Sequence, residues 1–161
     1  MVEEEKAAGA YKPKFFTMAA YQTLRVLCPI IIPPDQDVGG ALEAGAPEFI
    51  DLLTSENPAY QLTLGGGIAW LDATCTDRFG SPFAACNAKQ QKEILDLLAF
   101  RENAAKDPAL GLGVDFFALL RDLTADAFFT SRIGIEYLGY IGNTYLPEFP
   151  GCPPLPDSGT V

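Results

Sequence analysis

Apolar residues recur every three or four positions along most of the chain, which is the spacing of one face of an α-helix. This pattern fills successive stretches that are separated from one another by proline, glycine and polar residues. No stretch alternates apolar and polar residues convincingly over the length of a strand. The sequence therefore predicts an all-α fold of five to six helices around one core, forming a helical domain over residues 15–138.

The first predicted helix covers residues 15–31. Thr17 is a suitable N-cap, and Phe16 and Tyr21 have the spacing of a hydrophobic staple across it. Because proline lacks a backbone N–H and clashes with the preceding turn, Pro29 is expected to kink or end this helix.

Proline or asparagine marks the start of the next three helices. Pro47 suits the first turn of the second helix, where its missing N–H is harmless. Asn57 is the expected N-cap of a long third helix. The glycines at 65–67 weaken the middle of this helix and are a candidate position for a break in it. Asn87 and Gln90 have the spacing of a capping box at the start of the fourth.

The last helix and the two ends of the chain have distinct patterns. Residues 115–131, capped by Asp107 or Asp115, are apolar on nearly every face and are predicted to form the central, most buried helix.

Residues 139–161 combine glycine, proline and aromatic residues too densely for a helix, so they are predicted to form an extended, irregular C-terminal arm. The arm is too apolar to be left in water, so a surface is expected to cover it. Residues 1–14 are predicted to form a flexible leader.

Composition and charge narrow the classes of function. The chain has 161 residues, enough for one domain, and 48% of them are hydrophobic. No uninterrupted apolar run is long enough to span a bilayer. Its 21 acidic and 11 basic residues give a net charge of −10, and a nucleic-acid binder needs a basic face. We therefore expect neither a nucleic-acid partner nor a membrane span.

The absence of histidine removes several kinds of active site. Ser-His-Asp and Cys-His catalysis, HExxH zinc sites and histidine-ligated iron all require it. The glycine-rich stretches lack the P-loop spacing and follow no predicted strand. We expect no catalytic residues, cofactor or metal site in this chain. The alternatives are a free-standing small helical enzyme that uses Asp, Glu or Tyr as acid and base, and a carrier with an apolar cavity under the Phe-rich helix.

The four cysteines contain no CxxC pair, so structural thiols or disulfides are expected. Cys75 and Cys86 flank a connector between helices and are a candidate disulfide, with two unrelated buried thiols as the alternative. Cys28 is expected to be a core thiol. For Cys152, on the arm, the alternatives are pairing with Cys28 or with a partner chain.

Several motifs occur in a fixed order over roughly residues 15–153. They are "IIP…D…GALEAGAPEFID", "LD…FG.PF", "FF.LLR.LT…F.TS.IG" and "GY.GN.Y.PE.PGC". Together they resemble the gluconate 2-dehydrogenase subunit 3 family. The resemblance implies a non-catalytic accessory subunit that binds, stabilises and helps to export a large FAD-dependent dehydrogenase of the glucose–methanol–choline (GMC) type. That partner would oxidise a sugar or sugar acid, often passing electrons to a cytochrome c subunit.

The resemblance also assigns the arm to the large subunit, because aromatic side chains are favoured interface anchors. The expected contacts are Tyr140, Asn143, Tyr145, Phe149 and Cys152. Many family members begin with a twin-arginine export signal, whereas this sequence begins "MVEEEKAAGAYKP". The four cysteines favour the periplasm, which is the expected location, with the cytoplasm as the alternative.

Overall fold

The computed structural model describes residues 11–143, 145, 147–148 and 151. Within this part of the chain the regular structure is entirely helical, which confirms the all-α prediction. The longer helices are α1 (Met18–Ile31), α2 (Ala46–Glu56), α4 (Gly66–Phe79), α5 (Ala88–Leu98) and α7 (Gly111–Thr130). The shorter ones are α3 (Pro58–Tyr60), α6 (Arg101–Lys106) and α8 (Arg132–Tyr137). No helix among the described residues is both long and apolar enough to cross a membrane.

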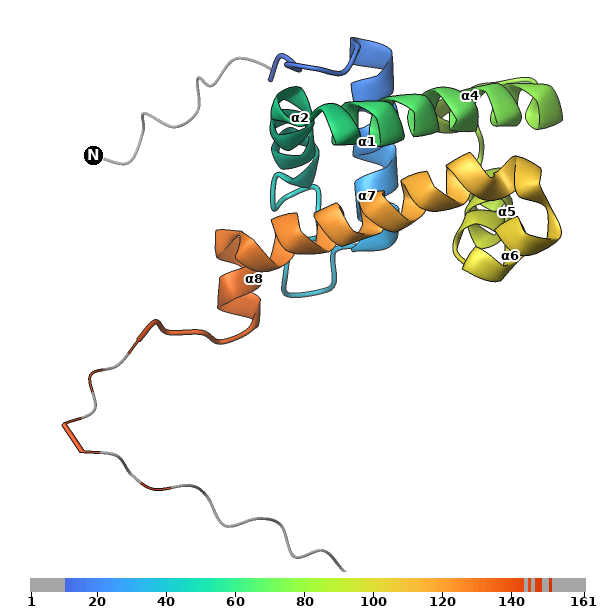
Figure 1. The fold of residues 1–161 in the computed structure, drawn as a ribbon. Helices are drawn as coiled ribbons and strands as arrows, with labels where there is room; N and C mark the ends of the chain where they lie inside the picture. The colour runs from blue at the N-terminus through green and yellow to red at the C-terminus, as the bar shows by residue number, and fades with distance from the viewer. Residues whose placement is uncertain (1–10, 144, 146, 149–150, 152–161) are drawn as a thin grey trace, which may run out of the picture.

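Helix α7 forms the centre of the fold. It packs against α1, α2, α4 and α5, and α8 follows directly at its C-terminal end (Figure 1). Phe116 and Leu120 on α7 are completely buried, as the predicted central helix requires. Helix α7 begins at Gly111, between the two predicted caps. Asp107 instead caps a short 3₁₀ turn, Pro108–Leu110, that leads into it.

The predicted caps of three helices are present. The Thr17 hydroxyl accepts a hydrogen bond from the Ala20 N–H at 3.2 Å. The Asn57 side chain accepts hydrogen bonds from the Ala59 and Tyr60 N–H groups of α3. Asn87 and Gln90 exchange two hydrogen bonds of 3.0 Å, which form the complete capping box. The N-termini of these helices depend on contacts within one helical turn, so the local sequence is enough to predict them.

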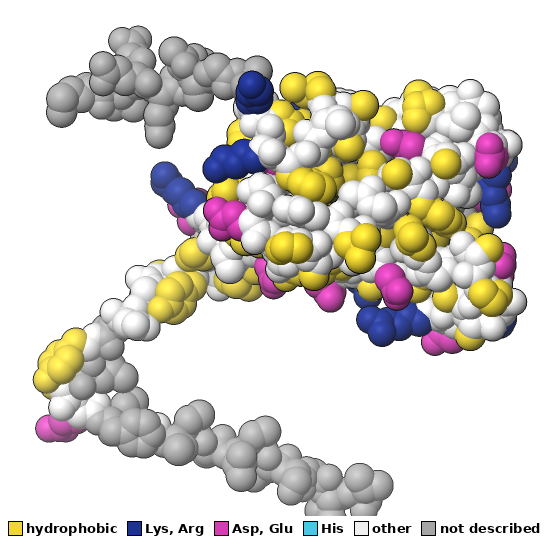
Figure 2. All heavy atoms as spheres, turned by 45° about the horizontal axis from the view of Figure 1, so that its top comes forward, with side chains coloured by type: hydrophobic (Ala, Val, Ile, Leu, Met, Phe, Trp, Pro, Cys, Tyr) yellow, Lys and Arg dark blue, Asp and Glu magenta, His cyan; other side chains and the backbone are white. Residues whose placement is uncertain are grey.

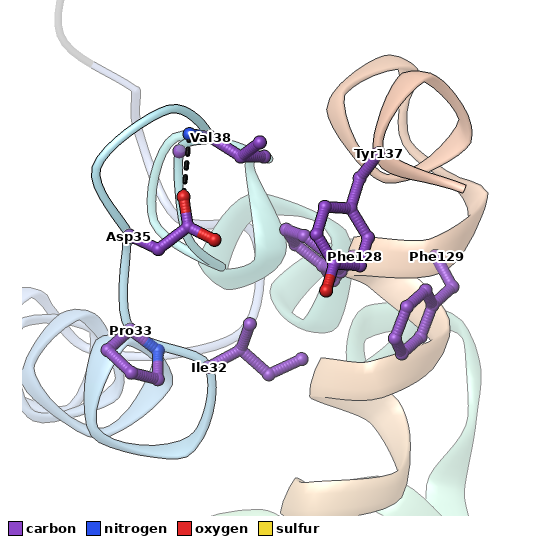
Figure 3. Close-up of a pocket in the computed structure, with 8 residues that line it drawn as sticks. Ile32, Pro33, Asp35, Val38, Phe128, Phe129 and Tyr137 are labelled. Atoms are coloured by element: carbon purple, nitrogen blue, oxygen red, sulfur yellow. Dashed lines mark hydrogen bonds between the residues drawn. The ribbon is translucent and has the colours of Figure 1, made fainter. Parts of the chain in front are cut away.

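Helix α1 does not end at Pro29. It continues to Ile31, and its last turn is closed by a 3.0 Å hydrogen bond from the Ile32 N–H to the Cys28 carbonyl. The proline therefore lies inside the final turn of the helix. The following loop, residues 32–39, lies beside the C-terminal end of α7 (Figure 3).

The glycines at 65–67 do not break the third predicted helix. Helix α3, a π-helical turn (Gln61–Gly65) and α4 follow one another without a non-helical residue. A Cβ atom on Gly67 would lie only 2.2 Å from the Phe116 ring. The glycine is therefore a packing requirement, since it lets α4 approach α7 closely.

A buried carboxylate on α2 holds the first described residues. Asp51 accepts hydrogen bonds from the Tyr11 hydroxyl (2.7 Å) and from the backbone N–H groups of Lys14 (2.6 Å), Phe15 (3.1 Å) and Phe16 (3.0 Å). Residues 11–14, which the sequence assigned to a leader, are thus attached to the helical body. No local pattern marks Asp51 as special, because its partners are 35 to 40 positions away in the sequence.

Candidate partner interface

The C-terminal arm follows α8, which is joined to α7 by a tight turn. The Ser131 hydroxyl caps α8 by accepting a hydrogen bond from the Gly134 N–H at 3.1 Å. A Cβ atom on Gly134 would lie 2.0 Å from the Phe128 carbonyl oxygen, so α8 packs directly on the end of α7. Beyond α8, residues 138–143 run away from the helical body (Figure 1).

Large apolar side chains on α8 and the described part of the arm are exposed to solvent. They are Ile135, Tyr137, Leu138, Tyr140, Ile141 and Tyr145. Ile141 and Tyr145 are 92% and 87% exposed. Figure 2 shows hydrophobic side chains on the arm standing clear of the body. Several large exposed apolar side chains within one short segment are typical of a binding site, whereas isolated exposed apolar residues are ordinary.

Three of the five predicted contact residues lie in this exposed region. Tyr140, Asn143 and Tyr145 are exposed, and the Tyr140 hydroxyl donates a 2.8 Å hydrogen bond to the Asn143 side chain. Phe149 and Cys152 lie outside the described residues. Contact of any of the five with a partner stays a prediction.

Four exposed apolar residues of the same region were not among the predicted contacts: Ile135, Tyr137, Leu138 and Ile141. Ile141 lies inside the closing motif, directly after Tyr140, so its apolar character in a glycine-flanked segment was the available signal. Tyr137 was assigned to the helical domain. Its exposure depends on the direction in which α8 leaves α7, and no local pattern reports that direction.

A small apolar pocket lies at the base of the arm (Figure 3). It has a volume of about 220 Å³ and lies between the loop after α1 and the α7–α8 corner. Its lining residues are Ile32, Pro33, Asp35, Val38, Gly39, Phe128, Phe129 and Tyr137. We call this cavity the arm-base pocket. Because Ile32 and Pro33 belong to the "IIP" motif and Phe128 to the "F.TS" motif, the pocket joins segments that are far apart in the sequence.

Hydrogen bonds and ring contacts fix both walls of the arm-base pocket. The Asp35 carboxylate accepts from the N–H groups of Asp37 (3.0 Å) and Val38 (2.8 Å), which closes the loop on itself. On the other wall, the Phe128 and Tyr137 rings meet edge to face with their centroids 6.2 Å apart. The arm-base pocket is thus preformed, with a volume suited to one or two side chains and too small for a typical cofactor.

A larger hollow lies between α1, α5 and α7. This groove has a volume of about 560 Å³ and an apolar floor that includes Ile31, Leu95 and Phe117. Lys92 and Asp96 on its rim form a salt bridge with each other. It is the place where the carrier hypothesis would put a ligand.

Three of the perturbed groups, Tyr11, Tyr21 and Asp51, lie elsewhere, where residues 11–21 meet α2. Another, Asp72 on α4, has a pKa raised by burial, and its carboxylate accepts a 3.0 Å hydrogen bond from the Phe83 N–H. Burial, followed by the hydrogen bond to Asp51, raises the pKa of Tyr11 well above its ordinary value. Burial and the 2.6 Å hydrogen bond to Glu48 raise the pKa of Tyr21 to about 12. For Asp51, burial alone would raise the pKa, but the donated hydrogen bonds outweigh it and lower the pKa.

The shifts of Tyr11, Tyr21 and Asp51 are opposite to those that acid–base catalysis near neutral pH requires. A phenol with a raised pKa does not ionise readily, and a carboxylate with a lowered pKa is a weak base. The cluster therefore acts as a clamp that fastens the N-terminal segment. Among the described residues there is also no group of three or more potential metal ligands from His, Cys, Asp and Glu.

The structure brings Cys75 and Cys86 together. Both are buried and free, and Cys86 is a neighbour of Cys75. A disulfide between them stays a prediction. Cys28 is completely buried, and its sulfur lies 3.9 Å from the Thr124 hydroxyl.

Comparison with known proteins gives one match. The family model described as gluconate 2-dehydrogenase subunit 3 matches residues 18–151, which include every helix described above and most of the arm. Searches of curated proteins and of solved structures found no match to this chain.

Proposed function

The chain belongs to the gluconate 2-dehydrogenase subunit 3 family, and from this membership we propose that it is the non-catalytic small subunit of a dehydrogenase complex. In this proposal it binds and stabilises a large FAD-dependent subunit of the GMC type. The large subunit oxidises a sugar or a sugar acid.

The observation that carries this proposal is the exposed apolar surface of α8 and the arm. Six large apolar side chains between residues 135 and 145 are exposed, and such a concentration of exposed apolar side chains marks an interaction site. Burying such side chains against a partner is favourable by about 1.5–3 kcal/mol each. Aromatic residues also lose little conformational freedom for the area they bury, which suits Tyr140 and Tyr145 to an interface.

The arm-base pocket extends this surface onto the helical body. Tyr137 lines the pocket and also belongs to the group of exposed apolar residues that continues into the arm. A partner that accepts the arm would therefore also face the pocket, and we propose that it inserts an apolar side chain there. Such a pairing of an anchor with a preformed pocket is typical of the energetic centre of an interface.

We propose that the redox groups lie outside this chain. The described residues are helical, whereas the dinucleotide-binding fingerprint needs a glycine-rich turn between a strand and a helix. FAD is accordingly assigned to the large subunit, and a cytochrome c subunit is the proposed electron acceptor. The proposed location of the complex is the periplasm, reached by joint export of the two subunits.

Co-expression tests the proposal. The large subunit is produced with this chain, without it, and with a variant that lacks residues 139–161, and soluble protein, flavin absorbance and sugar-dependent dye reduction are measured. We expect flavin-loaded, active large subunit only with the full chain, and no activity from this chain alone. Equal yield and activity of the large subunit in all three cases would contradict the stabilising role.

A further inference from the structure

The connector between α4 and α5 brings two thiols together inside the protein. Cys75 lies on the buried face of α4 and is completely inaccessible, while Cys86 ends the 3₁₀ turn Phe83–Ala85 and is 7% exposed. Cys86 is a neighbour of Cys75, and the Phe83 N–H of the connector donates a hydrogen bond to the Asp72 carboxylate, which is one helical turn before Cys75 on α4. Both thiols are free in the structure.

Contacts that do not involve the thiols hold the connector in this position. The Phe83 N–H donates a 3.0 Å hydrogen bond to the Asp72 carboxylate on α4. The Gln91 side chain on α5 donates a 3.1 Å hydrogen bond to the Phe83 carbonyl. The Phe83 side chain itself is completely buried in the core. Because these groups fix the backbone next to Cys86, the approach of the two sulfurs follows from the fold.

We propose that Cys75 and Cys86 form an intramolecular disulfide by exchange with an external disulfide, such as that of a thiol–disulfide oxidoreductase. In the first step the Cys86 thiolate attacks the donor disulfide, whose S–S bond breaks and releases one donor thiolate. In the second step the Cys75 thiolate attacks the Cys86 sulfur of this mixed disulfide and displaces the second donor thiolate. The chain loses two protons and two electrons, and the donor is reduced to two thiols.

The order of the two steps follows from accessibility. Cys86 is the only one of the pair with exposed surface, and its sulfur lies 3.5 Å from the Ser81 carbonyl oxygen near the surface of the connector. Burial, followed by the neighbouring Cys86, raises the pKa of Cys75 to about 12. Because exchange requires a thiolate, oxidation of the folded protein should be slow, and the disulfide should form during folding or local opening.

The bond would lock the connector onto α4. It would close the loop from residue 75 to residue 86, which contains the positive-φ turn at Gly80 and the core residue Phe83. A closure of this length is expected to raise Tm by roughly 5–10 °C. The inference does not depend on the proposed function, because it concerns only the folding of this chain.

Peptide mapping after refolding tests the inference. The full chain is unfolded, refolded with either dithiothreitol or a mixture of oxidised and reduced glutathione, alkylated and digested with trypsin without reduction. Trypsin cleaves after Arg78, so Cys75 and Cys86 fall on different peptides. We expect a linked pair only in the glutathione sample, retained in Cys28→Ala and lost in Cys86→Ala.

Thermal unfolding of the same samples provides the second measurement. We expect the oxidised chain to melt roughly 5–10 °C above the reduced chain, and Cys86→Ala to show no redox-dependent difference. Circular dichroism establishes that each variant has folded. Alkylation of both Cys75 and Cys86 in the glutathione sample, or linkage of either to Cys28 or Cys152, would overturn the proposal.

Discussion

Replacing Ile141 with alanine tests whether the arm binds the large subunit. The side chain is 92% exposed, so its truncation removes almost no contact within the chain itself. If the partner buries it, the truncation removes the carbons beyond Cβ from the interface. At about 0.8 kcal/mol for each buried CH₂ group, the loss is about 2 kcal/mol. That loss corresponds to a roughly 30-fold increase in Kd.

The assay measures Kd between the purified large subunit and each variant by isothermal titration calorimetry. Leu62→Ala is the matched control, because Leu62 is also apolar and 79% exposed but lies in the π-helical turn before α4, outside the arm and the arm-base pocket. Both substitutions should leave the free energy of unfolding within about 0.5 kcal/mol of the original. A Kd for Ile141→Ala within about twofold of the original, or an equal effect of Leu62→Ala, would refute the reasoning.

Three further predictions concern the stability of the helical body. Asp51→Ala removes a buried carboxylate with several hydrogen bonds, so it should lower the free energy of unfolding by about 3 kcal/mol in urea titrations. It should also speed tryptic cleavage after Lys14. Unchanged stability would contradict the role of Asp51 in fastening the N-terminal segment. The folded-state pKa of Asp51 is lowered, so its stabilising contribution is complete above the unfolded pKa of about 3.9 and is lost as pH falls through the folded value. Urea titrations between pH 6 and pH 3 should therefore show a steeper loss of stability for the original chain than for Asp51→Asn, and parallel curves would count against this assignment. Gly67→Ala should lower the free energy of unfolding by about 1–3 kcal/mol, because the new Cβ would overlap Phe116. Gly66→Ala, whose Cβ would have no heavy atom within 4 Å, should raise it by up to about 1 kcal/mol. Similar thermal shifts for the two variants would refute the packing argument.

The features that could be predicted from the sequence depend on neighbours along the chain. The caps at Thr17, Asn57 and Asn87 are each completed within one turn, so their residue types are sufficient evidence. The burial of α7 followed from apolar residues on all of its faces. The helix over residues 101–106 was missed, because it is short and has no capping side chain of its own.

The features that could not be predicted depend on contacts between distant residues. Asp51 is one acidic residue among 21 in the sequence, and only the fold places the Tyr11 hydroxyl and three backbone N–H groups around it. The glycines at 65–67 were expected to weaken the helix, because helix propensity takes no account of packing against a neighbouring helix. The arm-base pocket likewise needs the loop after α1 to meet the α7–α8 corner. The composition of the arm, however, did predict a segment that neither helix nor strand would absorb.

Native mass spectrometry of the complex isolated from the protein's own host tests the central claim most directly. The chain, tagged at its N-terminus, is purified with and without residues 139–161, and the intact mass and flavin absorbance of each preparation are recorded. The account predicts an equimolar complex with a large flavoprotein for the full chain, and loss of that flavoprotein when the arm is removed. A colourless species of 17.3 kDa plus the tag, obtained from the full chain, would contradict it.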